Sequence, residues 1–181
     1  MEREHIEYDV IIVGAGPSGL SAACRLKQLK PKTSIAIVEK GSEVGAHILS
    51  GAVLEPTALD ELFPNWKDLG APVNTAVSQD ELYFFTKTKS IKIPHFLAPK
   101  TMKNNGNFII SLGNLCRWLA KQAERLGVDI FPGFPASSLL YSNDGSVSGI
   151  ITGDMGIDAK NEKKSSYTQG MEIRGKYTLL S

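Results

Sequence analysis

The feature that most constrains the fold of this chain is a glycine-rich turn between a short apolar strand and a helix. Residues 10–13 read Val-Ile-Ile-Val, a β-branched run typical of a parallel strand buried on both faces. Gly-Ala-Gly-Pro-Ser-Gly follows directly and matches the pattern G-x-G-x-x-G. Leucine and alanine then recur at helical spacing from Leu20 to Leu29, and Ser34 to Val38 predicts a second buried strand. Strand, turn, helix and strand therefore predict one βαβ unit.

Each glycine of this turn has a mechanical reason, and together they predict a dinucleotide site. Gly14 permits the tight turn, Gly16 leaves room for a pyrophosphate beside the backbone, and Gly19 lets the helix pack closely on the strand. The helix N-terminus offers free N–H groups and a positive dipole end to phosphates. Glu39, 20 residues after Gly19, can accept a hydrogen bond from a ribose 2′-hydroxyl. The motif alone leaves open whether the ligand is FAD or NAD, and a purely structural turn is the alternative. The candidate cofactor-binding residues of this unit are Gly14, Ala15, Gly16, Pro17, Ser18, Gly19, Glu39 and Lys40.

Composition argues against several kinds of partner and against targeting or membrane-spanning segments. The 181 residues include 20 basic and 19 acidic residues, so a net charge of +1 gives no electrostatic case for nucleic acid. Cys24 and Cys116 lie among apolar residues of helical patterns, where reduced, buried thiols are expected rather than a metal site. The N-terminus is acidic, and no uninterrupted apolar run approaches about 18 residues. We therefore expect neither a signal peptide nor a transmembrane helix.

The segment after Glu39 changes character twice. Gly41 to Pro56 is rich in small residues and predicts a loop on which a flat group can pack. His47 lies at its centre, either as an ordinary loop histidine or in a chemical role. Thr57 to Trp66 predicts a short helix with apolar residues at i, i+3, i+4 and i+7. That apolar face fits a protein core or a membrane interface.

The remainder alternates strands with one further helix. Asp80 to Pro94 predicts a hairpin, and Ile93 to Met102 a loop with exposed apolar side chains. The expected elements that follow are a strand at Phe108–Ile110, a helix capped by Ser111 and ending near Leu126, a strand at Val128–Phe131, a hairpin of Ser137–Tyr141 with Val147–Thr152, a solvated loop at Asp158–Gly170, and a strand at Glu172–Leu180. The predicted fold is α/β, a three-layer Rossmann-like domain with a parallel sheet and a β-rich insertion. The predicted boundaries are 1–75 and 106–181 for the two parts of the nucleotide-binding domain and 76–105 for the start of a second domain. The sequence ends within a strand pattern, so we expect the first part of a longer protein.

Three stretches carry a resemblance to a known family. They are GAHILSGAVLEPTALDELFPNWKDLGAP, NNGNFIISLGNLCRWLAKQAERLGVDIFPGFPASSLLY and GIITGDMGI. With these in view, the chain resembles electron transfer flavoprotein–ubiquinone oxidoreductase over nearly its whole length. The resemblance implies an FAD enzyme that passes electrons from reduced electron transfer flavoprotein to ubiquinone through FAD and a 4Fe-4S cluster.

The resemblance also implies roles for particular residues. Gly14 to Gly19 would hold the FAD pyrophosphate and Glu39 the adenosine ribose. Gly45 to Ala52 would lie near the flavin, and backbone around Phe134 to Ala136 would face the adenine. Within the flavin loop the nearest candidates are His47, Ser50 and Gly51, and Asp154 is a further candidate for shaping the FAD site. No catalytic residue is expected, because the cofactor carries the chemistry.

The same resemblance implies surroundings and leaves alternatives. The protein would be a monomer in peripheral contact with the cytoplasmic face of a bacterial inner membrane, with Thr57–Trp66 and Ile93–Met102 as candidate contact segments. The ligands of the 4Fe-4S cluster would lie outside this chain. Where related flavoproteins often have an arginine, this sequence has Ser111, so either Arg117 compensates or the phosphate contacts come from backbone alone. A geranylgeranyl-reductase-like flavoprotein and a non-catalytic dinucleotide-binding module are the alternative functions.

Overall fold

The computed structural model describes residues 3–48, 51–158 and 162–181, and it divides into two compact units. The first unit comprises Met1–Ile48 with Cys116–Ser181, and the second comprises Leu49–Leu115. The chain thus leaves the first unit and later returns to it. The domain boundaries expected near residues 75 and 106 stay a prediction.

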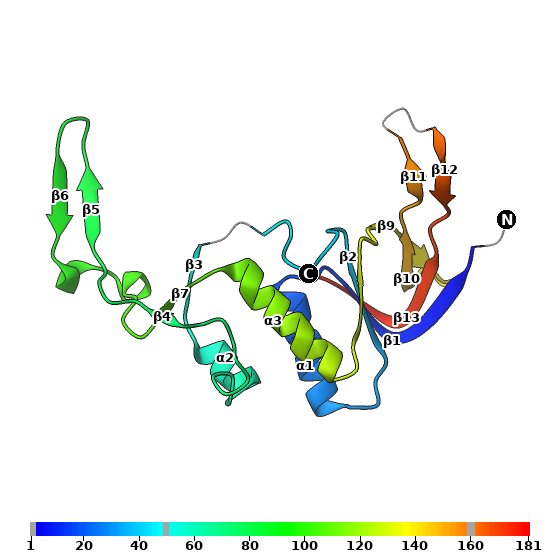
Figure 1. The fold of residues 1–181 in the computed structure, drawn as a ribbon, viewed down its shortest axis with the longest axis horizontal. Coiled ribbons are helices and arrows are strands. Elements are labelled where there is room, and N and C mark those ends of the chain that lie inside the picture. Colours follow the sequence, from blue (N-terminus) through cyan, green and yellow to red (C-terminus); the bar gives the residue numbers. More distant parts are fainter. Residues whose placement is uncertain (1–2, 49–50, 159–161) are drawn as a thin grey trace. The chain divides into compact units, whose positions relative to one another are not determined.

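The first unit is built on a six-stranded mixed sheet (Figure 1). Its strand order is β8-β2-β1-β13-β10-β9. The bounds are β1 (His5–Val13), β2 (Ile35–Glu39), β8 (Asp129–Pro132), β9 (Ala136–Tyr141), β10 (Val147–Thr152) and β13 (Glu172–Leu180). The strands β8, β2, β1 and β13 run parallel, while β10 and β9 add antiparallel to the edge of β13. The α/β, Rossmann-like prediction is confirmed, with an antiparallel pair extending the parallel sheet.

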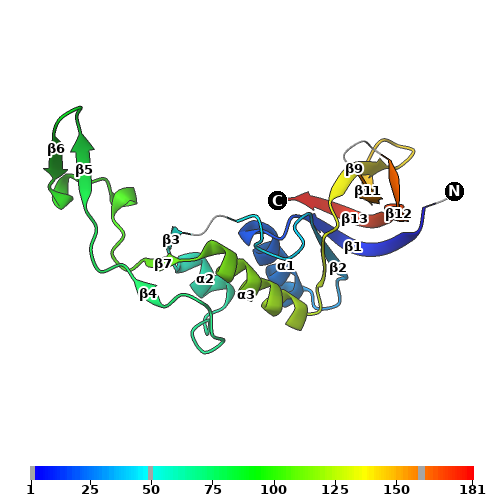
Figure 2. The same ribbon diagram turned by 45° about the horizontal axis from the view of Figure 1, so that its top comes forward.

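Two helices accompany this sheet, α1 (Pro17–Leu29) and α3 (Leu112–Arg125). Both views show them side by side, and the Cys24 thiol on α1 lies 4.0 Å from the Leu119 carbonyl oxygen on α3 (Figures 1 and 2). Cys24 and Cys116 are buried free thiols, as predicted, and burial raises their pKa values to about 12 and about 11. Lys27 is also buried, and its ammonium donates to the carbonyl oxygens of Pro31 and Thr33 at 3.2 and 3.0 Å. That contact fixes the turn from α1 into β2.

An apolar cluster joins the parallel and antiparallel parts of the sheet. Ile11 and Val38 from the parallel strands pack with Ile150 and Ile173 from β10 and β13, and all four are buried. Leu139 of β9 packs against the same cluster. The antiparallel strands are therefore part of the core of the first unit.

The predicted solvated loop at Asp158–Gly170 is wrong. The described residues of that stretch include a strand, β12 (Lys163–Thr168), which pairs antiparallel with β11 (Met155–Ile157). The sequence KKSSYT is polar and shows no apolar alternation, so no local pattern predicted this strand. It forms because its partner strand supplies the hydrogen bonds.

The second unit contains a three-stranded sheet and a separate hairpin. The sheet has the order β3-β7-β4, with β3 (Ala52–Leu54), β4 (Thr75–Ala76) and β7 (Phe108–Ile110). The predicted hairpin is confirmed as β5 (Leu82–Phe85) and β6 (Ser90–Ile93), followed by the short 3₁₀ helices η1 (His95–Leu97) and η2 (Lys100–Met102). The stretch 41–56, predicted as a loop, therefore contains the strand β3.

The predicted helix from Thr57 to Trp66 ends early, because α2 spans Thr57–Leu62. Phe63 has φ −138° and ψ 83°, as expected before Pro64, whose ring disfavours helical backbone in the preceding residue. Phe63 and Trp66 are nonetheless buried, and the Trp66 indole donates to an Asp60 carboxylate oxygen at 2.7 Å. Core packing, not a membrane face, is therefore the role of these aromatic side chains.

The loop predicted to expose apolar side chains does so. Phe96, Leu97 and Met102 are exposed, and the neighbouring hairpin exposes Phe84, Phe85 and Ile91. We call the segment Leu82–Met102 the apolar hairpin segment. None of the helices described is long and apolar enough to span a membrane.

Candidate dinucleotide site

The glycine turn connects β1 to α1, and its three glycines meet different surroundings. Gly14 has φ +109°, and a Cβ there would overlap the carbonyl oxygen of Ser181. A Cβ on Gly19 would overlap the carbonyl oxygen of Gly14 and crowd Ile12. At Gly16, by contrast, no described atom lies within 4 Å of the position of a Cβ. Gly14 and Gly19 are therefore required by the protein's own packing, whereas Gly16 borders open space that a ligand can occupy.

The N-terminus of α1 is prepared for an anion. Gly16 is its N-cap residue with φ −78° and ψ 179°, and no side chain among the described residues caps it. The first turn, Pro-Ser-Gly, carries no acidic residue. The first N–H groups of the helix and the positive end of its dipole therefore remain available to a phosphate.

Glu39 is fixed beside this turn by two backbone hydrogen bonds. Its Oε2 accepts from the Ala15 N–H at 3.0 Å, and its Oε1 accepts from the Gly41 N–H at 2.7 Å. A carboxylate has about four lone-pair sites, so each oxygen retains capacity to accept another donor. The position at the end of β2 and the fixed orientation suit a hydrogen bond from a ribose hydroxyl.

Phe134 and Ala136 are reached through the connection from β8 to β9. The Phe134 N–H donates to the Glu39 carbonyl oxygen at 2.9 Å, and Gly133 N–H donates to that of Gly41 at 2.7 Å. Ala136 is the first residue of β9. A cavity of about 390 Å³ borders Phe134 and Thr152. The structure therefore brings Phe134 next to Glu39, although the two lie far apart in the sequence.

The hydrogen bonds described above do not involve the other predicted cofactor-binding residues. Lys40, Ser18 and His47 are exposed. Gly51 has φ +97° and belongs to the second unit, and Ser50 lies outside the described residues. Their predicted contacts with a flavin stay a prediction.

One charged pair near Glu39 was not expected. The Arg117 guanidinium on α3 lies 3.3 Å from Oε1 of Glu43, in the loop after β2. The two residues are 74 positions apart, so no local sequence pattern signals the contact. The resemblance suggests Arg117 only as a substitute for an arginine at position 111. Ser111 itself accepts from the Asn114 N–H at 3.4 Å, as a capping residue does.

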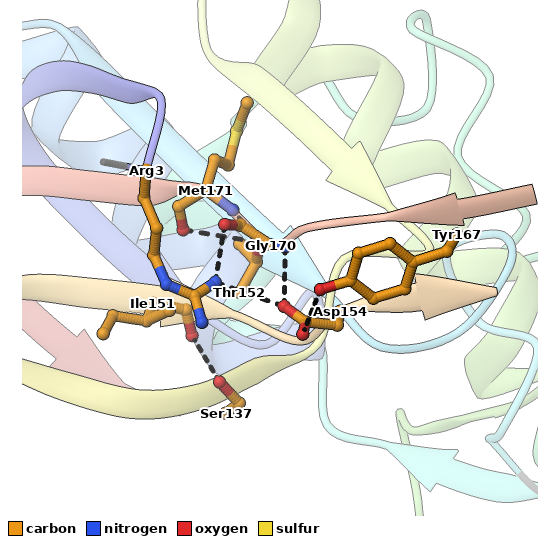
Figure 3. A network of polar contacts seen from close by, with 8 residues as sticks. All are labelled: Arg3, Ser137, Ile151, Thr152, Asp154, Tyr167, Gly170 and Met171. Atoms are coloured by element: carbon orange, nitrogen blue, oxygen red, sulfur yellow. Dashed lines mark hydrogen bonds and ion pairs between the residues drawn. The ribbon is translucent and has the colours of Figure 1, made fainter. Parts of the chain in front are cut away.

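Asp154 organises the base of the β11–β12 hairpin (Figure 3). Its Oδ1 accepts from the Gly170 N–H at 2.8 Å and from Arg3 at 3.2 Å, and its Oδ2 accepts from the Tyr167 hydroxyl at 2.9 Å. The Gly170 hydrogen bond, followed by that of Tyr167, lowers the pKa of Asp154 below its usual value. Both oxygens therefore already accept hydrogen bonds from the protein, and a contribution to the cofactor site stays a prediction.

The fold is of the Rossmann-like class, and the open space at Gly16 and the uncapped N-terminus of α1 suit a dinucleotide. Residues 12–80 match the family model described as an NAD(P)-binding Rossmann-like domain. The electron transfer flavoprotein–ubiquinone oxidoreductase of Pseudomonas aeruginosa is 62% identical over 187 residues, covering 100% of this chain and 34% of the relative. The mitochondrial enzymes so named from Dictyostelium discoideum and Rattus norvegicus are 52% and 47% identical, and 30% of each is covered. Over its whole length, the chain thus corresponds to the N-terminal part of the electron transfer flavoprotein–ubiquinone oxidoreductases, as the sequence motifs indicated. It spans about a third of the length of these relatives.

Solved structures support the fold. A geranylgeranyl bacteriochlorophyll reductase-like protein from Thermoplasma acidophilum superposes with a TM-score of 0.68 at 22% identity, covering 98% of this chain and 39% of that one. A myxobacterial FAD-dependent halogenase gives a TM-score of 0.61 at 14% identity, covering 97% of this chain and 37% of that one. At these identities the likeness establishes the architecture alone.

Proposed function

We propose that this chain is the FAD-binding part of an oxidoreductase that transfers electrons from reduced electron transfer flavoprotein to ubiquinone. The observation that carries the proposal is the 62% identity over the entire chain to an enzyme of that name. The site geometry is compatible with it, because open space at Gly16, a free helix N-terminus and a fixed Glu39 carboxylate suit a dinucleotide.

Different residues would bind different parts of FAD. Gly14 to Gly19 and the N-terminus of α1 would hold the pyrophosphate, and Glu39 the adenosine ribose. The backbone from Phe134 to Ala136 would face the adenine, and the loop with His47, Ser50 and Gly51 the flavin ring. The flavin, when bound, supplies the electron storage, and these residues bind it and fix its orientation.

The implied cluster and quinone would depend on other parts of the protein. A 4Fe-4S cluster is held by four cysteine thiolates, and this sequence has two cysteines, Cys24 and Cys116, which are buried in the two helices of the first unit. The ligands of a 4Fe-4S cluster would therefore come from outside this chain. Electron transfer flavoprotein and ubiquinone are the proposed partners, and a monomer is the proposed state.

Membrane contact at the cytoplasmic face of a bacterial inner membrane is proposed for the apolar hairpin segment. Its exposed phenylalanines are interleaved with exposed lysines at 87, 89, 92 and 100. Apolar side chains suit the acyl region and lysines suit anionic headgroups, so the combination favours a peripheral, interfacial site. This proposal extends the contact expected at Ile93–Met102 to the β5–β6 hairpin.

The alternative of a geranylgeranyl-reductase-like function has weaker support. Its structural likeness comes at 22% identity, against 62% for the quinone-reducing relative. The non-catalytic alternative predicts a protein without flavin reduction. Both are separated from the main proposal by the same experiment.

The purified full-length protein should be yellow, should bleach when mixed anaerobically with reduced electron transfer flavoprotein, and should regain colour on adding a ubiquinone analogue. This chain by itself is expected to be inactive in complete electron transfer, because the cluster ligands would lie outside it. Flavin that bleaches with no recovery by quinone would contradict the quinone-reducing proposal. A colourless protein that does not take up added FAD would contradict FAD binding altogether.

Gly16→Val tests the placement of the cofactor. A valine side chain would occupy the open space at residue 16 without meeting described protein atoms within 4 Å of its Cβ. We therefore expect an apoprotein with the unfolding midpoint of wild-type apoprotein and no bound FAD, measured by thermal unfolding and by flavin absorbance. Normal flavin occupancy in this variant would contradict the placement.

A further inference from the structure

A continuous set of contacts links Arg117 to the glycine turn. The Arg117 guanidinium pairs with Glu43 at 3.3 Å. A Cβ on Gly41 would lie 3.1 Å from the Glu43 carbonyl oxygen and 3.1 Å from Glu39 Oε1, so these groups surround Gly41 closely. Glu39 in turn accepts from the Ala15 N–H at 3.0 Å. The cation on α3 is therefore attached to the loop that borders the candidate dinucleotide site.

The electrostatic surroundings of Cys116 support the same proximity. Burial is the main cause that raises the pKa of this thiol, the positive charge of Arg117 lowers it, and the negative charge of Glu39 raises it. Both charges thus act on one side chain that precedes Arg117 on α3. Arg117 and Glu39 therefore both lie near Cys116.

A dinucleotide brings a doubly negative pyrophosphate into surroundings that already contain two carboxylates. The glycine turn offers backbone N–H groups, which are dipoles rather than full charges. Glu39 and Glu43 add negative charge near the turn. Binding the phosphates therefore favours a cation nearby, and a guanidinium can donate two parallel hydrogen bonds to a phosphate. The side chain of Ser111, just before α3, is neutral.

We propose that Arg117 is a further cofactor-binding residue, which donates to the pyrophosphate of FAD and is positioned for this by Glu43. The inference rests on the proposed function, since it presumes an FAD site at the glycine turn. An exposed ion pair alone contributes little to folding, and both side chains are substantially solvent-accessible, at 43% and 65%. We therefore attribute the pair to holding Arg117 at the loop after β2 rather than to stability.

The test compares Arg117→Gln with Arg125→Gln in the apoprotein. Both changes remove one positive charge from α3, but Arg125 is in its last turn and contacts Gln122 at 3.3 Å. Eight helical residues correspond to about 12 Å, beyond the Debye length of about 8 Å at physiological ionic strength. FAD affinity is measured by quenching of flavin fluorescence, and ADP and adenosine are compared as competitors, because only ADP carries a pyrophosphate.

We expect Arg117→Gln to weaken FAD and ADP about tenfold to a hundredfold, the range for a hydrogen bond to a charged group. Adenosine affinity and the unfolding midpoint of the apoprotein should not change. Arg117→Lys should recover part of the loss, because lysine retains the charge without the forked donors. Glu43→Gln should weaken FAD by a smaller factor, because it leaves the cation in place but less fixed.

Three results would overturn the proposal. They are unchanged FAD and ADP affinity in Arg117→Gln, an equal loss in Arg125→Gln, or an equal loss of adenosine affinity, which would indicate a purely structural role. A wild-type protein that does not bind FAD would instead overturn the proposed function. The two failures are therefore distinguishable.

Discussion

The sheet of the first unit and the apolar hairpin segment of the second use similar residues in opposite environments. Ile11, Ile12 and Ile37 in the sheet are fully buried. Phe85 and Phe96 in the hairpin segment are 73% and 78% exposed. The sheet has neighbouring strands and helices that cover its apolar side chains, whereas β5 and β6 form a two-stranded sheet by themselves. An apolar sequence therefore produces a core only where the topology supplies further layers.

The polar contacts of the two regions also differ, because they are local in the hairpin segment and long-range in the first unit. In the hairpin segment, Lys92 pairs with Glu81 at 2.5 Å, and the Thr86 hydroxyl accepts from the Lys89 N–H at 3.0 Å. These are local contacts between exposed groups. In the first unit, polar groups join residues far apart in the chain, as the Lys176–Asp9 pair does at 2.7 Å. The hairpin is thus stabilised by contacts between residues close in the chain, while the sheet is stabilised by contacts between distant segments of the first unit.

The largest expected effect separates buried from exposed aromatic residues within the second unit. Trp66→Ala should lower the free energy of unfolding by about 3–5 kcal/mol, because it removes a buried indole that packs edge-on against Phe108 at 5.9 Å. Phe84→Ala, at an exposed position of β5, should change it by no more than about 0.5 kcal/mol. Urea unfolding measures both. Equal losses would remove the distinction between core and hairpin.

The next largest effect is on membrane binding, for which the exposed side chains of the apolar hairpin segment matter and the buried ones do not. The double substitution Phe85→Ser with Phe96→Ser should weaken binding to vesicles of anionic lipid at least about tenfold, since burying one such side chain contributes about 1.5–3 kcal/mol. The unfolding midpoint should stay at its wild-type value, because both side chains are exposed.

Leu29→Ser is the matched control for vesicle binding. Leu29 is also exposed, but it ends α1 in the first unit. If Leu29→Ser weakened vesicle binding as much as the phenylalanine changes, the contact would not be specific to the apolar hairpin segment.

The smallest expected effect concerns acid stability of the first unit. The Asp9 carboxylate accepts from Lys176, which is the largest cause, and from Ser34, and these contacts lower its pKa from 3.8 to about 2. A depressed pKa contributes stability above about pH 4, and the contribution is lost as pH falls toward 2. Asp9→Asn should therefore flatten the decline of the urea midpoint over that window. An unchanged decline would show that Asp9 does not take part in acid unfolding.

Local chemistry explains what the sequence predicted well. The glycine turn and its strands were predicted because strand, turn and helix follow one another directly in the chain, and because the steric limits at Gly19 come in part from its near neighbours Gly14 and Ile12. The β5–β6 and β9–β10 hairpins were predicted because each pairs adjacent segments around a polar turn. The early end of α2 was missed, although its signal is local, since Pro64 acts on the residue before it.

Pairing between segments far apart in the chain explains which elements and contacts could not be predicted from the sequence. β3 and β4 have three and two residues, too short for an alternating pattern, and both exist as partners of β7. β12 is a polar strand stabilised by β11 and by the Asp154 contacts. The pairing of Arg117 with Glu43 depends on how α3 packs beside the loop after β2. None of these leaves a periodic signal in its own segment.

The pairing of β1 with β13 has a consequence for synthesis of the protein. The two strands pair along their length at a separation of 167 residues, and Ser181, which follows β13, lies against Gly14 of the turn. At about 5–20 residues per second, a ribosome needs roughly ten to thirty seconds between making β1 and making its neighbour. During that interval β1 can pair with β2, only 25 residues away, but its other edge is open. The nascent chain should therefore acquire cofactor affinity late, once β13 has been made and Ser181 can lie against Gly14.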